Sequence, residues 1–309
     1  MGFKKPLREL DLGEILGKTF SLYSSRFLLF YLPFLVAGLI TGAWGEAVRW
    51  MFPEPAAPPP TAPPDVLLSY FFSMLGVLAV TLPLTILVSW IIDTIVRGIA
   101  VKVASDILEG RSVDLSKALN FTATRLLSLL GAGIVTGVLI VMGLICLVVP
   151  GIILVIMFSL VVPVIILEQA GTFQSLSRSR KMVGGRWLKT FALLLIVYII
   201  ITVASFIFVE ISGVGFRGPA RWIVSSVLGA LVSPILPIAV TLYYYSMVAR
   251  EQPPSPLLEI PEPTPPAAPA AQPSFPGPPA KIHCVYCGAE NEANAVICRK
   301  CGMRIVKQT

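Results

Sequence analysis

The sequence predicts an all-α polytopic membrane protein with six transmembrane helices and short amphipathic helices on the cytoplasmic side. One stretch, Leu126–Leu167, runs for 42 residues without Asp, Glu, Lys or Arg. As one helix it would measure about 63 Å, roughly twice the hydrocarbon thickness of a bilayer, so this stretch must cross the membrane twice. The whole chain is 55% hydrophobic and 13% charged, whereas soluble domains carry about 25% charged residues.

Hydropathy divides residues 1–250 into a membrane domain with six spans. These are expected at residues 27–44, 66–102, 126–148, 151–167, 187–209 and 222–245. Between the third and fourth spans we expect the chain to reverse at Pro150-Gly151, because proline cannot continue a helix and glycine permits a sharp turn. In the long second span, Pro83 is the expected kink.

Lysine and arginine are distributed unevenly between the two ends of these spans. Sixteen fall on the side that holds the N-terminus, against three on the other: Arg49, Arg217 and Arg221. Because cytoplasmic loops carry the excess of basic residues, both termini are predicted to be cytoplasmic in a multi-pass protein of the cell membrane. Tyr243–Tyr245 would then lie in the aromatic belt at the inner interface.

Three stretches that precede the first, third and fifth spans align without gaps. Starting at Leu16, Leu115 and Leu176, each has Lys or Arg at the second position after the leucine and Arg at the tenth. The pattern predicts a short amphipathic helix in the headgroup region, followed by an arginine at the membrane surface. Candidate contacts with anionic headgroups are Lys18, Arg26, Lys117, Arg125, Arg178 and Arg186.

The alignment favours three repeated units, each an interfacial helix plus a pair of spans. The composition common to inner interfaces would produce a similar match without repetition, and the helices would then simply pack on the bundle. The first copy has an expected capping box, with Asp11 at the N-cap and Glu14 three residues later.

Charged residues within the spans are few. Asp93 and Arg97 are one helical turn apart and are expected to pair near the membrane interface. Glu168 and Glu210 are expected at the ends of the fourth and fifth spans. Deeply placed charges would mark an ion path, but interfacial positions are the simpler interpretation. No catalytic residues are predicted, because no nucleophile lies in a recognisable arrangement with a base.

Two proline-rich segments are expected outside the membrane. Residues 52–65 form an outer loop, and residues 251–280 form a disordered linker that favours extended polyproline geometry. The linker leads to a predicted small module at residues 281–309.

Four of the five cysteines lie in this module, as Cys284-x-x-Cys287-Gly and Cys298-x-x-Cys301-Gly. Such turns direct two thiolates at one ion, and two of them supply the four sulfur ligands that tetrahedral Zn²⁺ prefers. Rubredoxin-type iron and a redox dithiol are the alternatives. His283 is interpreted as a neighbour of the site, and Cys146 as a buried, apolar-like residue within the apolar run.

Two regions resemble known families. The segment CVYCGAENEANAVICRKCG (284–302) resembles the zinc ribbons appended to many prokaryotic membrane proteins. The motifs DLGEILGKTFSLYSSRF, VVPGIIL, VPVIILEQAGTFQSLSRSRKMVGG and TLYYYSMVARE resemble the membrane domain at the N-terminus of some glycerophosphoryl diester phosphodiesterases and of uncharacterised relatives. The catalytic barrel of those enzymes has no counterpart in this chain, so the resemblance does not imply their activity.

These features predict a non-enzymatic membrane scaffold or adaptor that binds anionic lipid and reaches a protein partner through its cytoplasmic zinc ribbon. The alternative is a small-molecule or lipid transporter with a regulatory ribbon. Nucleic acid is not an expected partner, because the net charge of the ribbon is only +3.

Overall fold

The computed structural model describes residues 4–215, 219–251, 281–292 and 295–305. The chain divides into two compact units, Met1–Ser255 and Pro256–Thr309. Of the predicted linker, residues 252–280 lie outside the described residues, as does Arg217.

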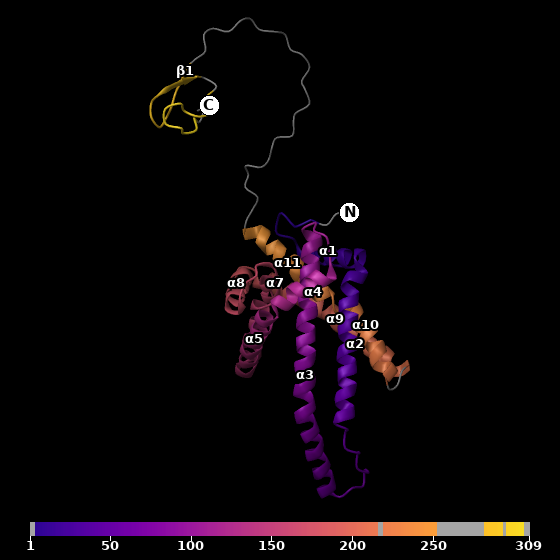
Figure 1. The fold of residues 1–309 in the computed structure, drawn as a ribbon. Helices are drawn as coiled ribbons and strands as arrows, with labels where there is room; N and C mark the ends of the chain where they lie inside the picture. Colours follow the sequence, from indigo (N-terminus) through magenta and orange to yellow (C-terminus); the bar gives the residue numbers. More distant parts are fainter. Residues whose placement is uncertain (1–3, 216–218, 252–280, 293–294, 306–309) are drawn as a thin grey trace. The chain divides into compact units, whose positions relative to one another are not determined.

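The first unit is helical throughout, and the second contains a small antiparallel pair of strands (Figure 1). The helices are α1 (Leu12–Ser25), α2 (Phe27–Met51), α3 (Pro64–Leu108), α4 (Leu115–Thr124), α5 (Leu126–Cys146), α6 (Val148–Met157), α7 (Val161–Leu167), α8 (Thr172–Gly184), α9 (Trp187–Gly215), α10 (Pro219–Val232) and α11 (Ile235–Glu251). The strands are β1 (Lys281–His283) and β2 (Glu290–Glu292).

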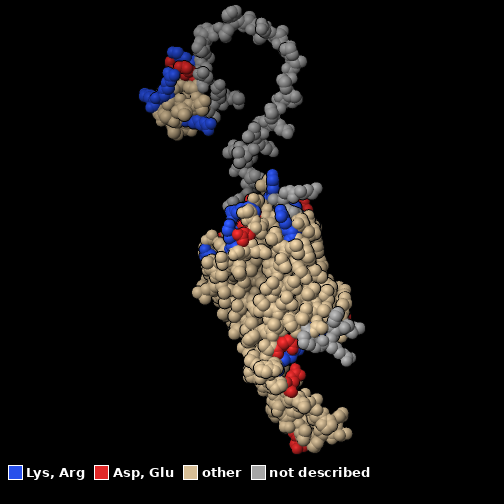
Figure 2. Space-filling view, turned by 45° about the vertical axis from the view of Figure 1, so that its right-hand side comes forward, with Lys and Arg blue, Asp and Glu red and all other residues tan. Residues whose placement is uncertain are grey.

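Six segments of the described chain are long and apolar enough to cross a membrane, as the sequence predicts. Four are the single helices α2, α3, α5 and α9, and two are the successive pairs α6–α7 and α10–α11. On the face shown in Figure 2, most Lys and Arg side chains of this unit gather at one end, a few charged side chains, mainly acidic, lie towards the other end, and a broad surface without charge lies between them. This distribution is that of a multi-pass membrane protein.

Helix α3 is longer than a bilayer requires. Its 45 residues span about 68 Å at 1.5 Å per residue, and it runs through Pro83 without interruption. Its last turns, from Val96 to Leu108, are largely buried, whereas the apolar window that qualifies as a span has no buried residue. One end of α3 therefore belongs to a protein core, and the rest presents apolar side chains outward.

The predicted reversal at Pro150-Gly151 is wrong. Helix α5 ends at Cys146, Leu147 is extended, and α6 already begins at Val148. Pro150 fits the first turn of α6, where backbone N–H groups lack intrahelical acceptors. Gly151 serves the packing of α6 on α5, because a Cβ at this position would lie 2.4 Å from the Leu144 side chain.

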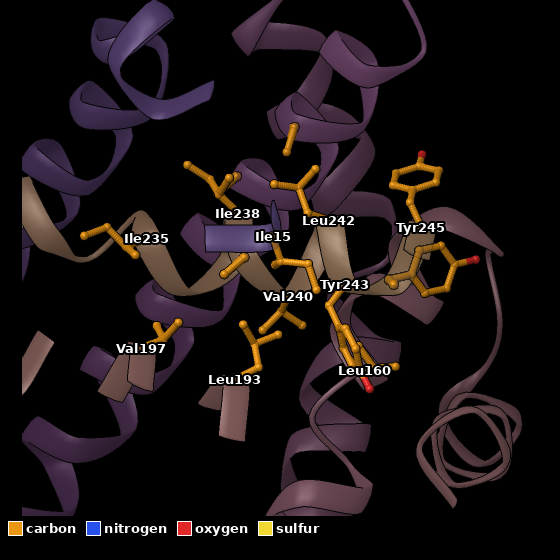
Figure 3. Close-up of a cluster of buried hydrophobic side chains, with 14 of the residues drawn as sticks. Ile15, Leu160, Leu193, Val197, Ile235, Ile238, Val240, Leu242, Tyr243 and Tyr245 are labelled. Carbon is orange, nitrogen blue, oxygen red and sulfur yellow. The ribbon is translucent and has the colours of Figure 1, made fainter. Parts of the chain in front are cut away.

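Helix α11 is the centre of the core. Nearly every residue from Ile235 to Met247 is buried, so this helix has no face left for solvent or lipid. Figure 3 shows its side chains meeting Ile15 of α1, Leu193 of α9 and Leu160 at the start of α7. A helix that is buried on all sides needs neighbours on all sides. Here these neighbours include α1, α9 and the start of α7.

Three consecutive tyrosines on α11 bind three different elements. Successive helical residues point about 100° apart, so adjacent side chains reach separate neighbours. The Tyr243 hydroxyl lies 2.7 Å from the Thr190 hydroxyl of α9, and Tyr244 donates to Glu168 at the end of α7 over 2.9 Å. Tyr245 donates to Glu109 at the end of α3 over 2.8 Å. These side chains are at most 6% exposed, so the expected aromatic belt is wrong for them.

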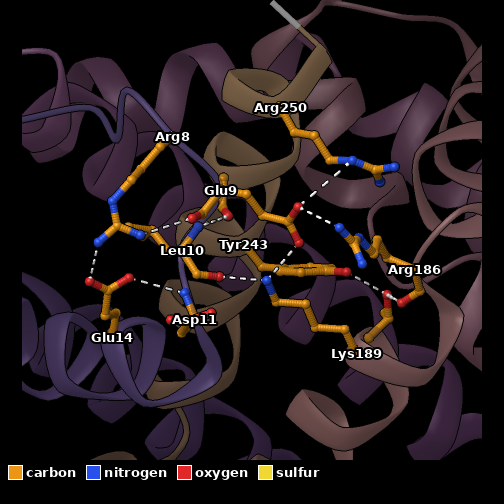
Figure 4. A network of polar contacts seen from close by, with 11 residues as sticks. Arg8, Glu9, Leu10, Asp11, Glu14, Arg186, Lys189, Tyr243 and Arg250 are labelled. Carbon is orange, nitrogen blue, oxygen red and sulfur yellow. Dashed lines mark hydrogen bonds and ion pairs between the residues drawn. The ribbon is translucent and has the colours of Figure 1, made fainter. Parts of the chain in front are cut away.

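The segment before α1 is held to α9 and α11 by Glu9 (Figure 4). Its carboxylate accepts from Lys189 at 2.7 Å and pairs with Arg186 at 3.2 Å and Arg250 at 3.7 Å. Next to it, the Leu10 N–H donates to the buried Ser246 hydroxyl of α11. Burial raises the pKa of Glu9, but the hydrogen bond from Lys189 and the three cations outweigh burial and hold the pKa below its usual value.

We expect Glu9→Gln to lower the free energy of unfolding at neutral pH by roughly 1–3 kcal/mol, the range for a hydrogen bond to a charged group. Because the folded pKa is lowered, the contribution of Glu9 is present above its unfolded pKa of 4.5 and is lost as the pH falls through the folded value. The measurement is thermal unfolding of the full chain in detergent, at neutral pH and at pH values below 4.5.

Glu54→Gln is the matched control, because Glu54 is exposed in the loop between α2 and α3 and has no ion pair in the described structure. Equal stability of the two variants at neutral pH would contradict the role of Glu9.

Candidate functional site

The two cysteine turns of the ribbon have the same backbone geometry. In the first, Gly288 N–H donates to Cys284 C=O at 2.8 Å, and in the second, Gly302 N–H donates to Cys298 C=O at 2.9 Å. Gly288 and Gly302 have φ of 71° and 72°, a left-handed conformation that glycine adopts without strain. The glycine after each pair of cysteines therefore closes a turn that directs both sulfurs to the same side.

The four sulfur atoms fit a tetrahedral metal ion. They lie within 4.8 Å of one another, with 3.7 Å between Cys284 and Cys301 and 3.6 Å between Cys287 and Cys298. Zn–S bonds of about 2.3 Å in a tetrahedron place sulfurs about 3.8 Å apart. Each measured pair joins one cysteine from each turn, so an ion at the centre would link the two halves of the ribbon.

Asn291 on β2 also connects the two halves, and the sequence analysis missed it. Its side-chain N–H₂ donates to Ala289 C=O at 2.8 Å and to the Cys298 sulfur at 3.5 Å. Its side-chain oxygen accepts from Arg299 N–H at 3.0 Å. A polar residue three positions after the glycine that closes the first turn is a weak signal in the sequence, and only its 6% exposure marks it as structural.

The pKa values of two of the thiols, Cys298 and Cys301, are shifted in opposite directions. Backbone N–H groups of Cys301 and Lys300 lower the pKa of the Cys298 thiol to about 6. At Cys301, the N–H of Met303 lowers the pKa, but burial and the neighbouring thiols outweigh it and raise the pKa to about 12. Metal binding must therefore release protons from this cluster, which makes the affinity fall in acid.

His283 is predicted to be a neighbour of the metal site and not a ligand. The His283 ring lies on β1, 3.6 Å from the Glu290 carboxylate, and is not part of the cysteine cluster. The expected burial of Cys146 is wrong, because this residue is the last of α5 and is exposed in the structure.

In the membrane domain, Asp93 and Arg97 form the expected pair, with 2.7 Å between the Asp93 carboxylate and Arg97 Nε. Both side chains are nearly half exposed. Glu168 lies at the end of α7 and pairs with Arg178, and Glu210 is exposed near the end of α9.

The six candidate headgroup residues fall into two groups. Arg178 bridges Glu168 and Glu251, Arg186 pairs with Glu9, and Arg125 donates to Gln169. These three side chains join elements of the protein. The other three side chains join no second element. Lys18 and Arg26 are exposed and have no ion-pair partner in the described part of the chain. Lys117 is exposed and makes one long ion pair, of 3.7 Å, with Asp114 at the N-cap of its own helix.

Comparison with known proteins identifies the ribbon. Residues 283–305 match the family of zinc-ribbon domains, which confirms this part of the sequence prediction. No curated protein and no solved structure matches the chain. The resemblance of the membrane domain to that of the phosphodiesterases therefore stays a prediction.

We expect Cys298→Ser to abolish metal binding and folding of the ribbon while the membrane domain stays folded. Loss of one of four ligands opens the site, and 29 residues are too few to fold on a hydrophobic core alone. The metal content of the purified full chain, measured by inductively coupled plasma mass spectrometry, should fall from about one ion per chain to background.

Cys146→Ser is the control, because it removes a thiol outside the ribbon and should leave the metal content unchanged. Retention of a full equivalent of metal by Cys298→Ser would show that the ligand set is wrong.

Proposed function

We propose that this chain is a non-enzymatic membrane scaffold that binds anionic lipid at its basic end and presents a cytoplasmic zinc ribbon to a protein partner. The observation that carries the proposal is the surface of the ribbon. Among the ribbon residues that the structure describes, the buried side chains are those of Cys284, Cys298 and Asn291, whereas five apolar side chains are exposed: Val285, Tyr286, Val296, Ile297 and Met303. Apolar exposure on a small folded module is typical of a protein-binding surface.

Zn²⁺ is the proposed ion, held by Cys284, Cys287, Cys298 and Cys301. The sulfur spacing and the zinc-ribbon match support it. A site with four protein ligands leaves the metal no open position for a water or a substrate, which favours a structural role over catalysis.

The lipid-binding part of the proposal rests on basic residues without a protein partner. Lys18 and Arg26 belong to the first of the aligned stretches, and Arg180 and Lys181 to the third; all four are exposed and make no ion pair with any residue that the structure describes. Basic side chains near an anionic surface contribute about 1 kcal/mol each. We infer that these four residues bind headgroups, whereas Arg178 and Arg186 hold the helices together.

We also infer that the three aligned stretches are repeated units. They correspond to α1, α4 and α8, each followed by a span that begins within three residues. The third position after the aligned leucine is a small residue in each: Thr19, Ala118 and Ser179, which are 0%, 1% and 0% exposed. A small residue buried at the same register favours a common packing mode over a chance similarity of composition.

Transport of a small molecule or lipid is the second candidate function. A cleft between α2, α3 and α10 favours it, because the cleft is lined by charged and hydroxyl side chains within three of the candidate spans.

The lipid-binding proposal predicts that the triple variant Lys18→Gln, Arg26→Gln, Lys181→Gln binds phosphatidylglycerol at least about ten-fold more weakly than the parent. Binding is measured by native mass spectrometry of the full chain in detergent, with phosphatidylcholine as the neutral lipid. The control Arg299→Gln, Lys300→Gln, Arg304→Gln removes the same charge from the ribbon and should bind like the parent. Equal loss in both variants would mean that net charge alone attracts the lipid.

The orientation is tested by cysteine labelling in a Cys146→Ser background. Ala57→Cys, in the exposed loop between α2 and α3, should react with a membrane-impermeant maleimide in intact cells. Asn120→Cys, exposed on α4, should react only after permeabilisation. The reverse pattern would overturn the cytoplasmic placement of the ribbon.

A further inference from the structure

A cleft of about 1030 Å³ lies in the membrane domain between α2, α3 and α10. This volume is at the upper end of the range for small-molecule sites, about 300–1,000 Å³. Along α2 its lining extends from Phe34 to Arg49, a rise of about 22 Å at 1.5 Å per residue. The cleft is therefore long enough for an elongated ligand.

The two ends of the cleft differ in polarity. Charged side chains line one end, where Glu46 and Arg49 of α2 meet Arg221 of α10. Towards the other end of α2 the lining includes the apolar side chains of Phe34, Val96 and Ala230. Asp93, one turn before Val96, also lines this part, and its charge is paired with Arg97 at 2.7 Å. Such an arrangement matches a molecule with a charged head and an apolar tail.

Three of the hydroxyl groups in the lining add little net polarity. Thr41 donates to Ala37 C=O of its own helix, Ser226 to Gly38 C=O, and Ser233 to Gly229 C=O. Because their protons are engaged with the backbone, these side chains present mainly acceptor oxygens and methyl or methylene groups. The charges at the polar end must therefore decide which headgroup binds.

Three of the charges that line the cleft already have partners. Glu46 and Arg49 pair with each other at 2.6 Å, and Asp93 pairs with Arg97 at 2.7 Å. Arg221 is the exception: no ion-pair or hydrogen-bond partner for it exists among the residues whose placement the structure describes. An unpaired guanidinium offers two parallel N–H donors that match the geometry of an oxyanion, and of phosphate in particular.

We infer that this cleft is a binding site for an amphiphile with a phosphate headgroup, held by Arg221, with its acyl chain directed towards Phe34, Val96 and Ala230. The inference goes beyond the proposed scaffold function, because it uses none of the exposed basic residues assigned to the lipid surface. It concerns binding, and it holds whether or not the bound molecule is transported.

The test compares three probes that differ by one part each. The full probe is 1-oleoyl lysophosphatidic acid. Glycerol 3-phosphate lacks its acyl chain, and 1-oleoylglycerol lacks its phosphate. Affinities for the full-length protein in detergent are measured by isothermal titration calorimetry. We expect lysophosphatidic acid to bind at least about ten-fold more tightly than either partial probe. Equal affinity for 1-oleoylglycerol would overturn recognition of the phosphate, and equal affinity for glycerol 3-phosphate would overturn the apolar subsite.

Variants locate the site. Arg221→Gln should weaken lysophosphatidic acid at least about ten-fold, the effect of one lost charge-assisted hydrogen bond. The matched control is Arg304→Gln, which removes an exposed arginine of the ribbon, outside the cleft, and should bind like the parent. Arg180→Gln removes an arginine that we assign to the lipid surface of α8, and it should weaken lysophosphatidic acid less than Arg221→Gln does. A loss in either of these variants equal to that of Arg221→Gln would overturn the inference.

A second variant fills the cleft without changing its charge. Ser89 of α3 is half buried in the lining and has no hydrogen bond in the described structure. Because the larger side chain would occupy the cleft, Ser89→Trp should exclude the acyl chain and abolish binding of lysophosphatidic acid. Unchanged affinity in a folded Ser89→Trp protein would exclude the cleft. If this variant does not fold, Arg221→Gln, which alters an exposed side chain, still decides the question.

Discussion

The membrane domain depends on burying α11 without leaving its polar atoms unsatisfied. This helix is enclosed on all sides, yet it carries three tyrosines and a serine near its C-terminal end. An unpaired polar group costs about 1–3 kcal/mol in such surroundings. Each hydroxyl instead bonds a different element: α9, the end of α7, the end of α3 and the segment before α1. The hydrogen bonds that remove this penalty also fix four elements around one axis.

The same region explains why several predicted lipid contacts are occupied by protein. Glu9 and Glu168 each attract arginines from other helices, so Arg186 and Arg178 contribute to packing. A guanidinium placed between carboxylates that are less than half exposed gains more from fixed partners than from mobile headgroups. The exposed lysines and arginines of α1 and α8 have no such partner, and this difference separates the structural cations from the proposed lipid contacts.

In the ribbon, the local geometry of the two cysteine turns determines most of the described structure. Each CxxCG turn is closed by its own glycine, and the sulfurs reach tetrahedral spacing with very few other buried side chains. A domain this small needs a cross-link such as a bound metal ion for its stability, and with such a cross-link its surface is free to expose apolar residues that a larger domain would bury. The closed ligand set and the exposed apolar side chains favour the same role, a binding module.

The sequence alone determined six apolar segments, the arginines that precede three of them, and the four cysteines that cluster in the ribbon, because hydropathy and short-range spacing are local properties. It misjudged the turn at Pro150-Gly151, since a proline fits the first turn of a helix as well as a loop. Only the tertiary structure decided that Tyr243–Tyr245 are buried, that Asn291 joins the two cysteine turns, and that Arg221 faces a cleft beside α2 and α3. These facts depend on residues far apart in the chain, and no local pattern encodes which distant side chain will become a neighbour.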